Sequence, residues 1–216
     1  SLQMMMEHAA ALVPGRVVVA MEDVRAYRWL AVATPVHVPV RAAYDGKDRV
    51  KVRLGDYAEG TAVLADAYPP APPADEAPLA ASVAPGITAR ELYDERWMFH
   101  GPAYQGIVHL DALGDDGIRG DIETGAARGA LLDNAGQLFG YWVMARYTSH
   151  RLAMPIGLRR VELFGPHPQP GERLTCTVRI RHVDDGQVGA DLCLARGGRS
   201  WARIQGWEDR RFDTEG

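Results

Sequence analysis

A proline-rich segment near the middle of this 216-residue chain limits the folds that the chain can adopt. Six prolines fall within residues 69–87, and Gly86 follows the last of them. Proline lacks a backbone N–H and fixes φ, so this segment cannot form a helix or a central strand. We therefore expect an extended linker over residues 69–87, between an N-terminal unit over residues 1–68 and a C-terminal unit over residues 88–213.

The two units show the same order of elements, a helix followed by a run of strands. Hydrophobic periodicity and turn residues predict, in the first unit, a helix over residues 2–13 and strands over 17–27, 35–44, 49–54 and 57–68. In the second unit they predict a long helix over 128–148 and strands over 154–164, 173–183, 188–196 and 200–207. A duplicated unit in the α+β class follows from this order.

The units differ in what precedes the main helix. In the second, a short helix over residues 88–95 and strands over 105–113 and 117–124 come first, whereas the first unit begins at its helix. Judged against the second unit, the first lacks roughly 40 residues at its start. We therefore expect the first unit to be truncated at its N-terminus.

Composition excludes several classes of protein. The net charge is −4, with no block of like charges, and no apolar run approaches the length of a membrane-spanning helix. We expect a cytoplasmic protein that binds neither nucleic acid nor membrane, and the bias of 22 Arg over 2 Lys suggests a GC-rich bacterial genome. Cys176 and Cys193 lack metal-ligand spacing and are expected to be reduced core residues. Neither a metal site nor a nucleotide-binding loop is predicted.

The helix over residues 128–148 carries the clearest candidate for a functional site in the chain. Asp133 and Gln137 are four residues apart, so they lie on the same face of a helix that is otherwise apolar. A carboxylate buried among leucines must be paired, protonated or used in chemistry. Gly136 and Gly140 on this helix each lower its stability relative to Ala, which predicts close approach by a strand or a ligand.

Three segments resemble the second half of a polyketide synthase dehydratase domain. They are Trp97-Met98-Phe99-His100-Gly101-Pro102-Ala103-Tyr104-Gln105-Gly106, Asp133-Asn134-Ala135-Gly136-Gln137 and Trp201-Ala202-Arg203-Ile204-Gln205-Gly206-Trp207. The Asp-x-x-x-Gln motif after a Gly-Pro-x-aromatic motif is fairly specific as a pair. The resemblance implies a double hotdog fold, in which each of two units has a helix wrapped by a curved antiparallel sheet.

The resemblance also implies a reaction and its residues. Members of this family remove water from a 3-hydroxyacyl thioester held on the phosphopantetheine arm of acyl carrier protein, and they need no other cofactor. Asp133 would be the catalytic acid, and Gln137 would hold it or the substrate hydroxyl. The substrate-binding loop would contain His100, Gly101, Pro102 and Tyr104. Expected partners are acyl carrier protein and other synthase domains, with a homodimer as one way to cover exposed edge strands.

The sequence departs from the family pattern at the catalytic base. The family has a His-x-x-x-Gly-x-x-x-x-Pro motif ahead of its first helix, and none of the seven histidines of this chain begins one. We expect His100 to shape the loop beside the acyl tunnel rather than to replace that base. Two alternatives remain open: a non-catalytic module that binds carrier protein or has a structural role, and a double-bond isomerase on the same fold.

Overall fold

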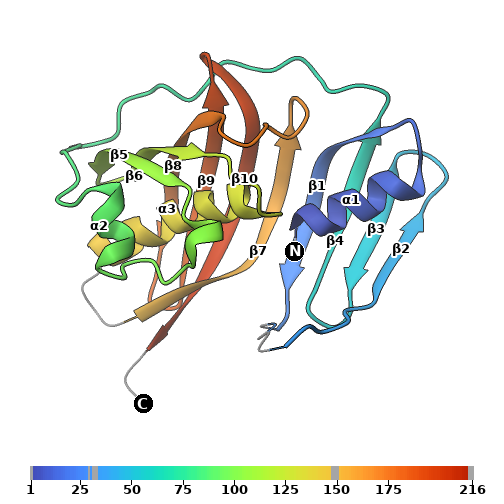
Figure 1. Cartoon of the computed structure of the whole chain (residues 1–216), viewed down its shortest axis with the longest axis horizontal. Coiled ribbons are helices and arrows are strands. Elements are labelled where there is room, and N and C mark those ends of the chain that lie inside the picture. Colours follow the sequence, from blue (N-terminus) through green and yellow to red (C-terminus); the bar gives the residue numbers. More distant parts are fainter. Residues whose placement is uncertain (1, 29, 31–33, 147–150, 214–216) are drawn as a thin grey trace.

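Two long helices each lie against one part of a single antiparallel sheet (Figure 1). The computed structural model describes residues 2–28, 30, 34–146 and 151–213. Its ten described strands follow the order β2-β3-β4-β1-β7-β10-β9-β8-β6-β5 across the sheet. The first unit contributes β1 to β4, and the second contributes β5 to β10.

The first unit packs α1 (Leu2–Leu12) on one face of four strands. These are β1 (Val17–Ala26), β2 (Val40–Tyr44), β3 (Arg49–Leu54) and β4 (Ala58–Ala65). Met5 and Ala9 lie one helical turn apart and are completely buried. Buried and more exposed residues alternate along β3 and β4, so one face of these strands packs against α1 while the other faces outward.

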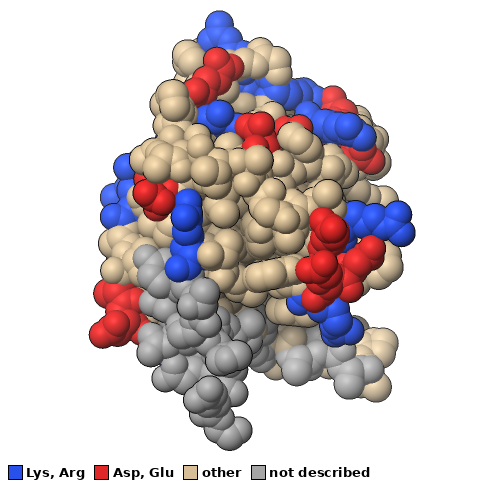
Figure 2. All heavy atoms as spheres, turned by 90° about the vertical axis from the view of Figure 1, so that its left-hand side faces the viewer, with Lys and Arg blue, Asp and Glu red and all other residues tan. Residues whose placement is uncertain are grey.

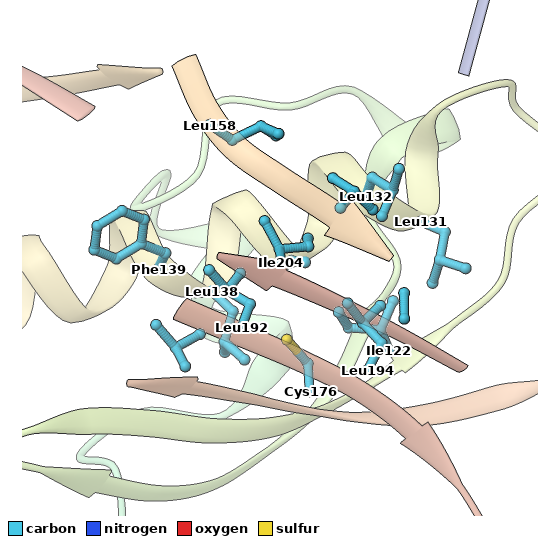
Figure 3. Close-up of a cluster of buried hydrophobic side chains, with 14 of the residues drawn as sticks. Ile122, Leu131, Leu132, Leu138, Phe139, Leu158, Cys176, Leu192, Leu194 and Ile204 are labelled. Carbon is cyan, nitrogen blue, oxygen red and sulfur yellow. The ribbon is translucent and has the colours of Figure 1, made fainter. Parts of the chain in front are cut away.

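The second unit is larger and has α3 (Ala130–Arg146) at its centre. It also contains α2 (Ala89–Asp94), the 3-10 turn η1 (Pro102–Tyr104) and six strands, which are β5 (Ile107–Gly114), β6 (Gly117–Glu123), β7 (Arg151–Leu163), β8 (Arg173–Val183), β9 (Gln187–Arg196) and β10 (Arg199–Asp213). Leu131, Leu138 and Phe139 of α3 pack with strand residues such as Ile122 and Leu194 in a buried cluster (Figure 3). Burial on several sides of α3 explains its apolar sequence.

The two units join edge to edge through β1 and β7. These strands pair antiparallel, with Ala20 opposite Glu162 and Arg25 opposite Gly157. The structure thus has two helices, each wrapped by its own portion of the sheet. This is the double hotdog fold that was predicted from the sequence.

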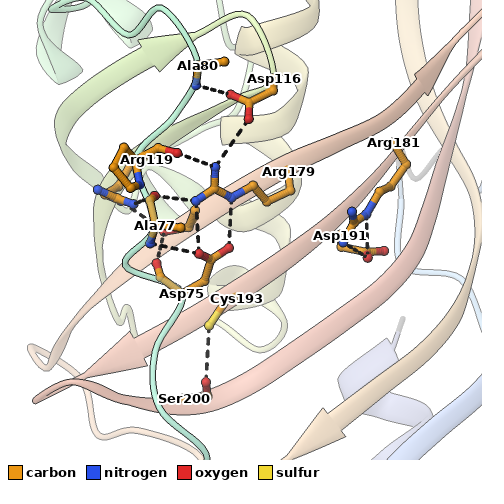
Figure 4. A network of polar contacts seen from close by, with 12 residues as sticks. Asp75, Ala77, Ala80, Asp116, Arg119, Arg179, Arg181, Asp191, Cys193 and Ser200 are labelled. Atoms are coloured by element: carbon orange, nitrogen blue, oxygen red, sulfur yellow. Dashed lines mark hydrogen bonds and ion pairs between the residues drawn. The ribbon is translucent and has the colours of Figure 1, made fainter.

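The proline-rich residues 69–87 are extended and cross the outer face of the second unit. The Arg179 guanidinium donates to both carboxylate oxygens of Asp75, at 2.9 and 3.0 Å, and to the carbonyl of Pro78 at 3.0 Å (Figure 4). Because of this ion pair, the pKa of Asp75 is lowered. Backbone bridges join Pro73 to Arg199 and Val83 to Leu113. This segment therefore adds a layer over the sheet.

Several element boundaries differ from those predicted, such as those of β4, which covers Ala58–Ala65 rather than residues 57–68. The second strand begins at Val40 rather than at residue 35, because Pro35 and Pro39 cannot donate to a ladder. The last strand continues to Asp213 rather than residue 207 and pairs with β7 and β9. The charged residues after Trp207 lack the apolar pattern by which a strand is predicted. The helix predicted to reach residue 148 is described to Arg146, and residues 147–150 lie outside the described part.

Two further sequence expectations can be compared with the described residues. Cys176 and Cys193 are both free and buried, as predicted. No described helix is long and apolar enough to span a membrane. Figure 2 shows charges of both signs interspersed on the face that carries the left side of Figure 1.

Candidate active site

A cavity of about 340 Å³ lies where the two units meet α3. The first unit contributes residues of α1, β1 and β4, and the second contributes α3, β7, β10 and the segment before η1. The residues that line the cavity include Gln3, Met98, His100, Asp133, Gly136, Gln137, Gly140, Met144, Met154 and Trp207. Asp133 and Gln137 thus face a cavity together, as their spacing predicted.

Gln137 holds one oxygen of the Asp133 carboxylate. The Gln137 Nε2 atom donates to Asp133 Oδ2 at 2.7 Å and to the carbonyl of Tyr104 at 2.8 Å. The side chain of Gln137 is almost completely buried, so these bonds form away from water. No described side chain donates to Asp133 Oδ1, and this second oxygen is therefore available to a ligand.

His100 approaches the same carboxylate from the loop before η1. Its Nε2 atom lies 3.5 Å from Asp133 Oδ2, and its ring stacks on Phe99 with centroids 4.6 Å apart. The Nδ1 atom of His100 is buried without a hydrogen-bond partner among the described residues. An imidazole and a carboxylate are therefore neighbours in the cavity, although 33 residues separate them in the sequence.

The remaining predicted loop residues lie beside the cavity rather than in its wall. Gly101 precedes the turn with an extended backbone, and Pro102 occupies the first position of η1. The Tyr104 hydroxyl donates to the carbonyl of Arg128 at 2.9 Å, just ahead of α3. Gly101, Pro102 and Tyr104 are absent from the cavity lining, whereas His100 is part of it. The Tyr104 hydrogen bond joins this loop to the start of α3.

A polar network behind Gln137 was not predicted from the sequence. The Tyr93 hydroxyl lies 3.1 Å from Gln137 Oε1 and accepts from the backbone N–H of Ile107 at 3.1 Å. Asn134 accepts from the Gly106 N–H at 2.8 Å, and burial raises the pKa of Tyr93 to about 12. Tyr93 is therefore a neutral hydrogen-bonding group. The network joins α2, α3 and the start of β5 behind the acid.

Trp207 of β10 forms the wall beneath the Asp133–Gln137 pair. A Cβ atom on Gly136 would lie 2.8 and 2.9 Å from Trp207 Cζ2 and Cη2, so only glycine fits there without a shift. The Trp207 indole N–H donates to Asp209 Oδ1 at 2.8 Å. Burial raises the pKa of Asp209 to about 7. The close approach predicted at Gly136 is confirmed, and the approaching group is this indole ring.

Asp133 is more exposed than its sequence neighbours suggested. Its side chain is 38% exposed, because it lies on the one face of α3 that borders the cavity. The expectation of a carboxylate buried among leucines is therefore wrong: Leu131 and Leu132 are buried, but Asp133 is not. Among the described residues, no cluster of three or more His, Cys, Asp or Glu side chains is arranged to hold a metal ion.

The chain thus combines a double hotdog fold with a carboxylate at the cavity between its two units. The sequence profile described as "Polyketide synthase dehydratase N-terminal domain" matches residues 67–216. The chain belongs to this polyketide synthase dehydratase family. A search of curated proteins gave no match.

Solved structures support the fold at low sequence identity. A trans-AT polyketide synthase dehydratase domain from Brevibacillus brevis has a TM-score of 0.77 and 14% identity, covering 98% of this chain and 84% of that one. An inactive CurK dehydratase, in which asparagine replaces an aspartate, has a TM-score of 0.72 and 18% identity, covering 98% and 81%. An isomerase-inactive variant of GphF DH1 has a TM-score of 0.69 and 19% identity, covering 100% and 82%.

Proposed function

We propose that this domain eliminates water from a 3-hydroxyacyl thioester to give an enoyl thioester. The observation that carries the proposal is the Asp133 carboxyl group at the cavity, with one oxygen held by Gln137 and the other open to a ligand. The inactivity of a CurK dehydratase with an aspartate-to-asparagine change supports an essential carboxyl group in this fold. The substrate would arrive on the phosphopantetheine arm of an acyl carrier protein, within a polyketide synthase.

The reaction requires one acid and one base. A base takes the proton from C2, the electron pair forms the C2=C3 double bond, and the C3–O bond breaks. The departing hydroxyl takes the proton of Asp133 and leaves as water. Because Gln137 donates to Oδ2, the proton of the neutral carboxylic acid would reside on Oδ1, the oxygen to which no described side chain donates.

His100 and Gln137 would position the acid from two directions. Gln137 is itself fixed by the Tyr104 carbonyl and by Tyr93, so its amide has one orientation. The Nε2 atom of His100 lies beside the same carboxylate oxygen, Oδ2, and would restrict the rotation of the Asp133 side chain. The base would be the histidine of the family motif, which residues 1–216 do not contain. His100 is therefore proposed as a positioning residue.

A double-bond isomerase is the second candidate. Moving a double bond along an acyl chain needs the same ability to take a proton from one carbon and return it to another. The observation that favours it is the structural similarity to the isomerase-inactive variant of GphF DH1. The two reactions differ in their products, since only dehydration releases water and lowers the product mass.

The test uses the polypeptide encoded by the complete gene and a 3-hydroxyacyl thioester on its carrier protein. Mass spectrometry of the acyl group should show loss of water in the wild type and a rate at least ~100-fold lower for Asp133→Asn. Asparagine keeps an oxygen that accepts from Gln137, so melting curves should match. An enoyl substrate whose double bond moves, without dehydration of the hydroxyacyl substrate, would favour the isomerase.

His100→Gln serves as the matched comparison for the role of the imidazole. A positioning role predicts a fall in kcat of roughly tenfold and a changed pH profile, because the amide replaces one neighbour of Asp133. A loss as large as that of Asp133→Asn would instead assign the base to His100. Wild-type protein that folds and binds substrate but converts neither thioester would leave the non-catalytic module as the better description.

A further inference from the structure

The polar and apolar groups of the cavity are unevenly distributed. Its polar side chains are Gln3, His100, Asp133 and Gln137, which gather around the N-terminal half of α3. Farther along α3 the lining residues are Gly140 and Met144, together with Met98 next to Gly140 and Met154 of β7. This second half, lined by Met98, Gly140, Met144 and Met154, is called the apolar end below.

The apolar end selects which part of the substrate can occupy it. A phosphopantetheine arm carries amide groups, and the side chains of the apolar end offer them no hydrogen-bond donor or acceptor beyond thioether sulfur. Burying such amides without partners is unfavourable. Methylene groups bind there without that penalty, so the acyl chain beyond the hydroxyl-bearing carbon fits the apolar end.

Gly140 leaves space at this end that the fold does not fill. A Cβ atom on Gly140 would meet one atom, Met98 Cε, at an ordinary van der Waals distance of 3.5 Å. Gly136, by contrast, is required by the indole of Trp207. Alanine at residue 140 would favour the helix and fit the fold, so packing does not explain the glycine. The glycine keeps the cavity open where it lines the wall.

The distance between Asp133 and Gly140 gives the length of chain that reaches this space. Seven residues of α-helix place Gly140 about 10 Å along the axis from Asp133, on the same face two turns later. An extended chain advances roughly 1.2 Å per bond, so about eight bonds separate a carbon at Asp133 from one at Gly140. With the hydroxyl on C3, an acyl chain of about 11 carbons spans this distance.

We propose that Gly140 is a specificity-determining residue, which admits apolar 3-hydroxyacyl chains of about 11 carbons along α3 past Asp133. The inference rests on the proposed function for the chemical nature of the substrate, but its consequence is a binding preference. It can therefore be measured without turnover.

The experiment compares two unreactive probes, the amide analogues of 3-hydroxyhexanoyl- and 3-hydroxydodecanoyl-pantetheine, by isothermal titration calorimetry. The wild-type chain should bind the 12-carbon probe more tightly. Gly140→Leu should lower the affinity for the 12-carbon probe at least ~tenfold, which is the contribution that burial of about two methylene groups makes to binding. The affinity for the 6-carbon probe should change by no more than about twofold. Gly140→Ala is the matched control and should resemble wild type for both probes.

Several outcomes would overturn the inference. It fails if Gly140→Leu weakens both probes equally while melting like Gly140→Ala, if the length preference is unchanged, or if wild type binds neither probe. Should Gly140→Leu not fold, Met144→Phe narrows the same end one turn later and must reduce the length preference. The protein could lack dehydratase activity and still prefer the 12-carbon probe in a way that depends on residue 140. That result would support this inference and reject the proposed reaction.

Discussion

The contact between Gly136 and Trp207 predicts that two equivalent substitutions on one helix will have different effects on stability. Replacing either Gly136 or Gly140 by Ala raises helix propensity by about 1 kcal/mol. At Gly140 the new methyl group makes an ordinary contact with Met98. At Gly136 it would lie 2.8 Å from the Trp207 ring, which its hydrogen bond to Asp209 and its place in β10 hold in position.

The gain in helix propensity is the same at both sites. The difference in the free energy of unfolding between the two variants therefore measures the cost of overpacking at Gly136. That cost is typically about 1–3 kcal/mol. Gly140→Ala should therefore be more stable than Gly136→Ala by about 1–3 kcal/mol, or roughly 2–12 °C in Tm for a chain of this size. Urea unfolding followed by circular dichroism measures both variants beside wild type. Equal stabilities would refute the assignment of Trp207 as the group that requires Gly136.

Three further predictions follow from buried polar groups. Burial in the folded state raises the pKa of Asp209 from 3.8 to about 7, so between these two pH values the folded state binds a proton that the unfolded state has released. The free energy of unfolding should therefore decrease as the pH rises from about 4 to about 7, by up to ~1.4 kcal/mol per pH unit. Asp209→Asn should remove this fall in urea titrations while keeping an acceptor for Trp207, and an unchanged pH dependence would contradict the assignment. Arg179→Met should destabilise the protein by about 1–3 kcal/mol at pH 7, since it removes the guanidinium partner of the Asp75 carboxylate and the donor to the Pro78 carbonyl. The loss should shrink at pH 3, because Asp75 contributes stability above its unfolded pKa of 3.8 and loses it as the pH falls through its lowered pKa; a loss that does not vary with pH would argue against the ion pair. Gln137→Leu should reduce the dehydration rate at saturating substrate by roughly tenfold through loss of the Asp133 contact, with similar substrate affinity, and a change in affinity alone would indicate substrate binding instead.

Patterns local in sequence predicted most of the fold. The strands Arg49–Leu54 and Arg173–Val183 were placed at their observed limits, because alternation and flanking turn residues define them without tertiary information. The spacing of Asp133 and Gln137 likewise fixed their shared helix face. Where prolines remove donors, as before Val40, or where charged residues occupy a paired strand, as after Trp207, the same patterns gave wrong boundaries.

Contacts between distant segments could not be predicted in this way. The approach of His100 to Asp133 depends on how the loop before η1 packs on α3. The supporting groups Tyr93 and Asp209 have no motif of their own, and only the folded chain places them behind the cavity wall. The exposure of Asp133 was also decided by tertiary structure, since it lies where the two units leave a cavity.

The central claim is that Asp133 supplies the proton that removes the substrate hydroxyl. The most direct measurement is the mass of the acyl group on the carrier protein after single-turnover reaction with wild-type polypeptide and with Asp133→Asn. Loss of water from the 3-hydroxyacyl thioester in the wild type, slowed at least ~100-fold in a variant that folds and binds normally, is the predicted result. Dehydration at the wild-type rate by Asp133→Asn would contradict it.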